Sequence, residues 1–411
     1  MTRRAITLTL SLLLGISLLF SLSTWLTTNT IDDQVPKKPL GMGATMLDVE
    51  SDNPISRYTQ VIPEVSMHFP DDHQAHPGFR QEWWYLTANL TTETGERLGL
   101  QWTQFRIALA PPSSQTSAVT TPTTPLEVLS SALANPKSTE WQTKQLYFAH
   151  TAITQKELHQ AHEKWSRAHP QLAGTATNPL RIKLDDWQWL SQTNGLFPAT
   201  LSASTADFAY VLELNSKAPL QLQGNQGYSV KSADGQVASY YYSQPFIDVS
   251  GTITQGSKDI KVQGKAWLDR EWSSQFLSRS QQGWDWFALR LNDGSALMLF
   301  QLRDSAQSTH TNDTASAFYS ARRMFTDGTG RNINSTEQPG GIKMTPLTWQ
   351  HTVNGDYPVS WQVTIPSEQI DVTVTALNPN SAMPLSTPYW EGPIQFTGSH
   401  TGTGYMELTG Y

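Results

Sequence analysis

Short runs of aromatic and β-branched residues, separated by Gly, Asn, Asp and Pro, dominate the chain from about residue 80 onward. Examples are WWYLTANL, LGLQWTQFRIAL, KQLYFAHTAI, FAYVLELN and IKVQGKAWL. Runs of this length at this spacing indicate an all-β sandwich or barrel rather than alternating strands and helices. Residues 155–168 (QKELHQAHEKWSRA) are the exception, because their pattern predicts a helix with a solvated face of histidine and charged residues.

Two Trp-rich hairpins are predicted half a chain length apart. WWYLTANLTTETGERLGLQWTQFR (83–106) and WDWFALRLNDGSALMLFQLR (284–303) each begin with Trp-x-aromatic, turn at a Gly and close on Gln-x-Arg. In the second, NDG is a strong signal for a tight turn. A duplicated β domain explains both segments, with a boundary near residues 243–250. Chance similarity of two Trp-rich hairpins is the alternative.

The N-terminus predicts export. Arg3 and Arg4 precede a run that carries no charge until Asp32. About 20 apolar residues suffice to span a bilayer, and the flanking charges keep the start of the chain in the cytoplasm. Residues 1–30 are therefore a signal peptide or a signal anchor, and residues 31–60 a linker. We expect the remainder on the periplasmic side of the inner membrane, anchored there or secreted to the periplasm.

Composition excludes several classes of function. The chain contains no Cys, which excludes disulfides, zinc–thiolate sites and thiol catalysis. Its 28 Lys and Arg against 35 Asp and Glu give a net charge of −7, so no nucleic-acid partner is expected. Trp is abundant, at 15 residues, whereas charged residues make up only 15%. These values predict a globular protein with an aromatic interior. No nucleotide-binding, serine-hydrolase or zinc-protease motif is present, and no cofactor is expected.

The first candidate site is HFPDDHQAHPGFRQEWWYL, residues 68–86. His73 and His76 lie near carboxylates, but their spacing matches no defined metal site, and a loop held by His–Asp hydrogen bonds is the favoured interpretation. In extended backbone, Glu82 shares a face with Trp84. Such a carboxylate is either paired with an Arg or has a pKa raised by desolvation.

The second candidate site joins GKAWLDREWSSQF (264–276) to GWDWFALRL (283–291). Trp267, Asp269 and Glu271 share one face of an extended segment. One interpretation is a set of buried Asp–Arg pairs. The other is a site where a carboxylic acid of raised pKa protonates an apolar substrate, with Trp faces stabilising the cation.

Asp285 belongs to the same region and lies on an apolar face of its strand. A carboxylate in such surroundings needs a partner. Arg270 and Arg290 are the candidates.

Several of these segments resemble the AttH/CrtC family. They are FPDDHQAHPGFRQEWWYLTANL, FAHTAIT, WLDREWSS with GWDWFALRLNDG, and the closing YWEGPIQFTG with GTGYMELTGY. That family contains carotenoid 1,2-hydratases, AttH-type predicted secreted hydrolases and, more distantly, kievitone hydratase. The resemblance runs from about residue 60 to the C-terminus and is strongest to the AttH-type branch. It implies two tandem lipocalin-like β-barrel or sandwich domains, residues 61–245 and 246–411, preceded by the signal or anchor helix.

The resemblance also implies a catalytic residue. The hydratases carry an aromatic-x-Asp motif whose Asp protonates a C=C bond before water adds to the cation. Here the motif matches Trp267-Leu268-Asp269, so Asp269 is the implied acid. The hydratases have Tyr and His around this Asp, whereas this chain has Trp267 and Arg270, and Arg270 would keep Asp269 ionised.

Glu82, Glu271 and Asp285 complete the predicted catalytic set. The predicted substrate-binding residues are the aromatic, His and Arg side chains nearby: His73, His76, Trp83, Trp84, Tyr85, Trp267, Arg270, Trp284 and Trp286.

Three functions stay open. The first is a hydratase or related lyase that acts on an isoprenoid or other lipid-like substrate. The second is a non-catalytic carrier of a hydrophobic small molecule that works with an inner-membrane ABC transporter, since lipocalin-like barrels hold such ligands. The third is a glycan-acting or glycan-binding protein, because Trp platforms beside paired carboxylates also suit a sugar.

Overall fold

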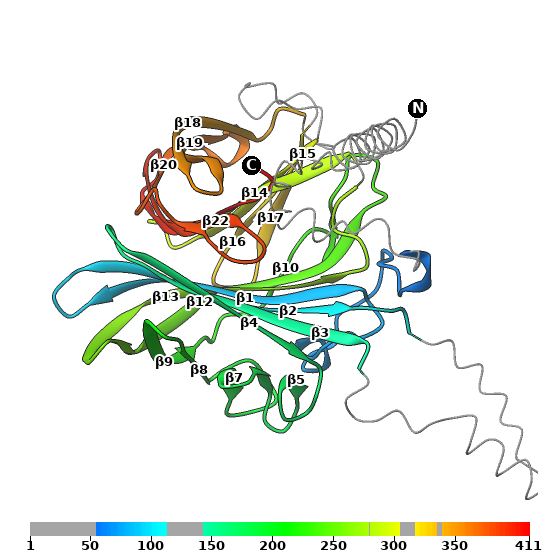
Figure 1. The fold of residues 1–411 in the computed structure, drawn as a ribbon. Coiled ribbons are helices and arrows are strands. Elements are labelled where there is room, and N and C mark those ends of the chain that lie inside the picture. The colour runs from blue at the N-terminus through cyan, green and yellow to red at the C-terminus, as the bar shows by residue number, and fades with distance from the viewer. Residues whose placement is uncertain (1–54, 113–142, 279, 305–316, 335–338) are drawn as a thin grey trace, which may run out of the picture. The chain divides into compact units, whose positions relative to one another are not determined.

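Two antiparallel sheets follow one another along the chain in this computed structural model (Figure 1). The structure describes residues 55–112, 143–278, 280–304, 317–334 and 339–411. The predicted signal or anchor segment and most of the linker lie outside these residues, so export stays a prediction. No helix in the described part is long and apolar enough to cross a membrane.

The first sheet runs in the order β4-β3-β2-β1-β13-β12-β9-β8-β7-β6-β5, with β10 and β11 pairing to β12. Its strands are β1 Gln81–Thr92, β2 Arg97–Ala108, β3 Gln145–Thr154, β4 His159–Arg167, β5 Ala173–Ala176, β6 Arg181–Leu184, β7 Trp187–Ser191, β8 Ala199–Ser204, β9 Phe208–Asn215, β10 Gln221–Leu222, β11 Tyr228–Val230, β12 Ala238–Gln255 and β13 Lys258–Ser273.

The second sheet runs in the order β17-β16-β15-β14-β23-β22-β20-β19-β18, with β21 pairing to β22. Its strands are β14 Gln281–Leu291, β15 Ala296–Asp304, β16 Phe318–Met324, β17 Gly330–Asn334, β18 Lys343–Thr352, β19 Gly355–Ile365, β20 Ile370–Ala376, β21 Ala382–Met383, β22 Tyr389–Gly398 and β23 Gly402–Leu408. The described helices are the short 3-10 turns η1 Ile55–Arg57, η2 Asp71–His73 and η3 Pro366–Glu368. The all-β prediction is therefore confirmed.

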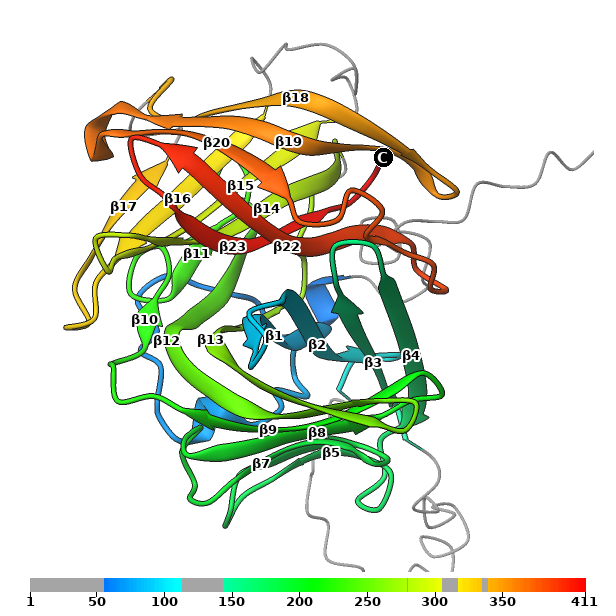
Figure 2. The same cartoon turned by 90° about the vertical axis from the view of Figure 1, so that its left-hand side faces the viewer.

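Each sheet curves around its own core. Trp84, Trp102 and Trp189 lie in the core of the first sheet, whereas Phe287 and Trp361 lie in that of the second. A third cluster joins the two sheets and includes residues adjacent in sequence to those core positions, such as Tyr85 and Trp286. This is the expected result of side-chain alternation along β1 and β14. The second sheet therefore packs against the outer face of β1, β2 and β13 (Figures 1 and 2).

The helix predicted for residues 155–168 is wrong, because most of this segment forms β4. It pairs with β3 from Leu146↔Arg167 to Thr154↔His159. Trp165 stacks on Phe148 of β3, with ring centroids 4.4 Å apart. Cross-strand contacts of this kind outweigh the weak helical preference of the isolated segment.

The chain passes from one sheet to the other at residues 274–280. The domain boundary predicted between residues 245 and 246 falls within β12, which belongs to the first sheet. The division into two independent domains stays a prediction.

Gly99 of β2 marks a close approach of the two sheets. A Cβ there would lie 2.6 Å from both Pro393 Cγ of β22 and the Tyr405 hydroxyl of β23. We expect Gly99→Ala to lower the free energy of unfolding by about 1–3 kcal/mol, the usual cost of overpacking. Urea unfolding measures this change. Gly195→Ala is the control, because its Cβ would meet no atom closer than 3.6 Å. Equal effects of both substitutions would contradict the packing described.

Candidate functional site

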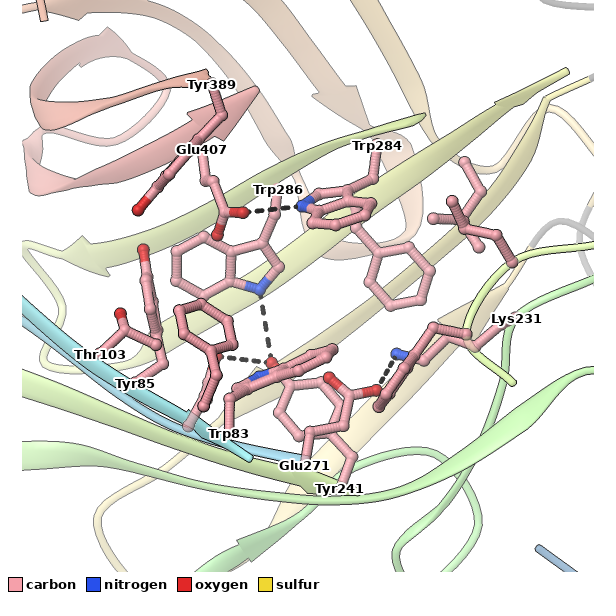
Figure 3. Close-up of a pocket in the computed structure, with 16 residues that line it drawn as sticks. Trp83, Tyr85, Thr103, Lys231, Tyr241, Glu271, Trp284, Trp286, Tyr389 and Glu407 are labelled. Atoms are coloured by element: carbon pink, nitrogen blue, oxygen red, sulfur yellow. Dashed lines mark hydrogen bonds and ion pairs between the residues drawn. The ribbon is translucent and has the colours of Figure 1, made fainter. Parts of the chain in front are cut away.

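A pocket lies between the two sheets, where the β1–β2 hairpin faces the β14–β15 hairpin (Figure 3). Most of its lining is aromatic or aliphatic. The lining residues are Trp83, Tyr85, Thr103, Phe105, Lys231, Tyr241, Asp269, Glu271, Phe276, Leu277, Trp284, Trp286, Phe300, Leu302, Tyr389 and Glu407.

The internal repeat builds half of this lining. In the first hairpin Trp83 pairs with Phe105 and Tyr85 with Thr103. In the second, Trp284 pairs with Leu302 and Trp286 with Phe300. All eight side chains line the pocket, at matching positions of the two hairpins. The predicted hairpins are confirmed, and they form the two walls of one pocket.

Asp269 lies on β13 directly opposite Tyr85 and is buried. Its carboxylate accepts hydrogen bonds from the Tyr241 hydroxyl (2.6 Å), the Ser243 hydroxyl (2.5 Å) and Trp267 Nε1 (2.8 Å). Burial raises the pKa of Asp269 to about 7, although these donors oppose the shift. The carboxyl can therefore gain and lose a proton near neutral pH.

Glu407 lies on β23, opposite Trp286, and its carboxylate accepts a hydrogen bond from Trp284 Nε1 at 3.0 Å. Burial raises the pKa of Glu407 to about 8. The Trp284 hydrogen bond opposes the rise, and the charges of Asp269 and Glu271 add to it. Figure 3 shows Glu407 on the wall opposite Tyr241 and Glu271.

Glu271 differs from these two carboxyls because it has a cationic partner. Lys231 Nζ lies 2.8 Å from Glu271 Oε1, and the Ser239 hydroxyl donates to the same oxygen. Lys231 also lies over the Phe300 ring, with Nζ 4.4 Å from the centroid. Among the described lining residues, Lys231 is the basic one.

The structure brings six of the predicted site residues together in the pocket. They are Asp269, Glu271, Trp83, Tyr85, Trp284 and Trp286. Trp267 touches the site through its hydrogen bond to Asp269. The other predicted site residues lie outside the pocket lining.

Glu82 points to the opposite side of β1 and is fully buried, with ion pairs to Arg106 and Arg270. His76 adds a backbone N–H and an Nδ1 contact at 3.2 Å. Burial alone would raise the pKa of Glu82, but the two guanidiniums hold it well below its usual range. The interpretation as an Arg-paired carboxylate is confirmed. The expected influence of Arg270 on Asp269 is wrong, because consecutive strand residues point to opposite faces.

Asp285 is buried on the far side of β14. Its partners are Arg303 (3.0 Å), the Gln301 amide (2.5 Å) and the Tyr411 hydroxyl (2.7 Å). The expected partners, Arg270 and Arg290, are wrong, because the partner comes from the neighbouring strand β15.

The histidine loop also lies outside the pocket lining. His73 Nδ1 contacts the Tyr242 hydroxyl at 2.8 Å, and its carbonyl accepts the Trp84 Nε1 hydrogen bond. His76 bridges Glu82 and Asp72. Within the described residues, no group of three or more His, Asp or Glu side chains is arranged to hold a metal ion.

The residues missed by the sequence analysis include Glu407, Tyr389, Tyr241 and Lys231. The first two come from the closing segment, residues 389–411. Extending the repeat by one strand finds Glu407, since β23 pairs with β14 as β13 pairs with β1. Extending it by one strand more finds Tyr389, since β22 pairs with β23 as β12 pairs with β13.

Stability should fall as the pH rises from 6.5 to 8. Burial raises the pKa of Asp269 to about 7 and that of Glu407 to about 8, so the native state holds protons that the unfolded state has lost. Each such group lowers the free energy of unfolding by up to about 1.4 kcal/mol per pH unit, until the pH passes its native pKa. Three buried histidines affect the free energy of unfolding only at lower pH, because burial lowers their pKa values to about 4. They are His73, His150 and His159.

Urea unfolding across this range measures the effect, and Asp269→Asn and Glu407→Gln should each reduce the slope. A wild-type stability that is constant or increases with pH would show that these carboxyls are already ionised in the native state.

Comparison with known proteins relates the chain to a sequence family and to solved structures. A sequence model of the AttH-like family matches residues 60–411. The crystal structure of an AttH protein from Nitrosomonas europaea is 33% identical, with a TM-score of 0.70, over 86% of this chain and 99% of that one. Kievitone hydratase from Nectria haematococca is 12% identical, with a TM-score of 0.59, over 85% of this chain and 95% of that one, and shares the fold. No curated protein sequence matches the chain.

Proposed function

The chain belongs to the AttH-like family, and from this premise and the chemistry of its pocket we propose that it is an enzyme of the hydratase type. The proposed reaction adds water across a C=C bond of an isoprenoid or other lipid-like substrate. Kievitone hydratase, by its name an enzyme that adds water, has the same fold. This likeness is the reason for choosing hydration among acid–base reactions.

One observation carries the proposal: Asp269 is a buried carboxyl on the wall of an aromatic pocket, and none of the described residues forms an ion pair with it. Burial raises the pKa of Asp269 to about 7, which is the range that suits a general acid or base at neutral pH. Protonation of an alkene by a carboxylic acid leaves a carbocation. The aromatic faces that line the pocket, such as Trp284 and Trp286, would stabilise that cation.

The lining also favours an apolar substrate. Ligand pockets bury most of a ligand against hydrophobic side chains and orient it through a few polar groups. Here the aromatic and aliphatic residues supply the surface, and the Lys231–Glu271 pair supplies a polar contact for a hydroxyl or carbonyl group. A substrate with many hydroxyls would leave most of them without partners.

The test begins with the bound molecule. The full chain is expressed with export, purified gently and extracted with organic solvent, and the extract is identified by mass spectrometry. The protein is also incubated with farnesol or geranylgeraniol in detergent micelles, and water addition is measured from product mass. We expect an unsaturated lipid in the extract and a hydrated product.

Thr103→Phe provides a pocket-filling variant. Its counterpart in the repeat, Phe300 of β15, carries the same ring on the pocket wall. We expect this variant to lose both ligand and turnover. Val211→Phe adds the same ring at a position 54% exposed and should change neither.

Other outcomes favour the remaining hypotheses. A lipid that is retained but never converted would support a carrier that serves an ABC transporter on the periplasmic side. Tryptophan fluorescence that shifts with oligosaccharides, and not with lipids, would support a glycan-binding protein.

A further inference from the structure

We infer that Glu407 is a second catalytic residue of this pocket, which donates the proton to the double bond, while Asp269 accepts the proton released by the attacking water. The inference rests on the proposed function. It reverses the role that the family resemblance gives to Asp269.

The strand register places Glu407 in the second sheet at the position that corresponds to Asp269 in the first. Tyr85 and Trp286 are matching residues of the repeat, and their cross-strand partners are Asp269 on β13 and Glu407 on β23. The match extends one strand further. Tyr241 and Tyr389 occupy matching places on β12 and β22, and both line the pocket.

The cross-strand neighbours of Asp269 and Glu407 differ between the two sheets. This difference gives the two carboxyls different roles. Ser243 pairs with Asp269 across the strands, whereas Glu391 pairs with Glu407. Asp269 therefore has a hydroxyl donor as its neighbour, and Glu407 has a second carboxyl. Glu391 is only 1% exposed and, within the described part of the chain, forms no ion pair.

The groups that face the two carboxyls come from every adjacent strand. Tyr241, Ser243 and Trp267 all donate hydrogen bonds to Asp269 and stabilise its ionised form. Around the Glu407–Glu391 pair lie Trp284, Tyr85 and Tyr389, with the negative charges of Asp269 and Glu271 acting on Glu407. The nearby cation, Lys231, is paired with Glu271.

Two adjacent carboxyls without a cation cannot both ionise at low cost, so at least one of them holds a proton. The pKa values agree with this argument. Burial and the charge of Glu407 raise the pKa of Glu391 well above its usual range, and burial also raises the pKa values of Glu407 and Asp269. The hydroxyl and indole donors beside Asp269 favour its ionised form, whereas the second carboxyl beside Glu407 favours a protonated form, so the geometry assigns Glu407 as the acid and Asp269 as the base.

The proposed step balances. The Glu407 carboxyl proton forms the new C–H bond with one alkene carbon, and the π electrons leave a cation at the other carbon. Water oxygen attacks that cation while its proton passes to the Asp269 carboxylate. The cycle closes when Asp269 returns this proton through solvent to Glu407. Because the two carboxyls lie on opposite walls, H and OH should add to opposite faces of the double bond.

Infrared spectroscopy tests the assignment on the purified full chain without substrate, so its result is independent of whether the proposed hydration occurs. The C=O stretching band of protonated carboxyls is followed from pH 5 to pH 10. We expect one component to disappear near pH 7 and another near pH 8. The Glu391 carboxyl, whose pKa is raised well above its usual range, contributes a further component that Glu391→Gln identifies. Glu407→Gln should remove the component that disappears near pH 8, and Asp269→Asn the one that disappears near pH 7.

Glu213→Gln, at an exposed position of β9, is the control and should leave both components unchanged. Should Glu407→Gln fail to fold, Glu407→Asp keeps a carboxyl and should shift the component near pH 8 without removing it. Loss of that component in Asp269→Asn, or its persistence unshifted in both Glu407 variants, would overturn the assignment.

Discussion

Asp269→Asn should lower kcat by about 10²- to 10⁴-fold, the usual contribution of a positioned acid or base, while ligand binding changes little. The amide keeps the shape of the carboxyl but cannot take up or release the proton. Turnover in the micelle assay measures the first quantity, and ligand recovered per protein chain after extraction measures the second.

Asp248→Asn is the matched control for this result, because Asp248 is an exposed residue paired with Lys265 on the outside of the first sheet. It should retain wild-type turnover. If Asp269→Asn also retained it, Asp269 would have no part in proton transfer, and its burial would have to be explained by structure alone.

Glu82→Gln should lower the free energy of unfolding by about 3–5 kcal/mol, the typical cost of removing one partner from a buried ion pair. Glu82, Arg106 and Arg270 are all fully buried, so the substitution leaves two guanidiniums without their counter-ion. Urea unfolding, monitored by tryptophan fluorescence, measures the loss.

An exposed ion pair provides the comparison. Asp186→Asn removes the partner of Lys164, and the Asp186 side chain is 54% exposed. Pairs of this kind contribute about 0–1 kcal/mol. Equal losses in Glu82→Gln and Asp186→Asn would contradict a buried charge network beneath β1.

Strand alternation made much of this architecture predictable from sequence. The Trp-x-aromatic and Gln-x-Arg repeats identified both hairpins, and the period-two pattern placed Asp269 and Glu271 on one face, which is the pocket face. The same alternation places Glu82 on the face of Trp84, where a buried carboxylate is expected to pair with an Arg. Its partners Arg106 and Arg270 come from the two neighbouring strands, and local pattern does not specify those pairings.

Long-range pairing explains what the sequence analysis missed. The segment from His159 to Arg167 has charges that suit a helix, but β3 supplies cross-strand partners for each of its residues. Asp285 contacts Arg303 because β14 and β15 are adjacent, and the predicted hairpin already implies that adjacency.

Glu407 and Tyr389 show the same limitation at the site. Nothing in their local sequence marks them. Tyr389, for example, begins a strand whose first six residues are all buried, so alternation does not distinguish its pocket face. Their significance arises only when β22 and β23 are matched to β12 and β13, which requires the strand order of both sheets.

The most direct test of the central claim, that this pocket adds water to an alkene, is turnover in H₂¹⁸O. The alkene extracted from the protein is returned to purified wild-type chain in isotopically labelled water, and the product is examined by mass spectrometry. We predict a product that has gained one water and carries ¹⁸O, formed by wild type and not by Asp269→Asn. If wild-type protein binds the alkene in its pocket and all of the alkene is recovered unchanged, the claim is contradicted. The carrier function would then be the one supported.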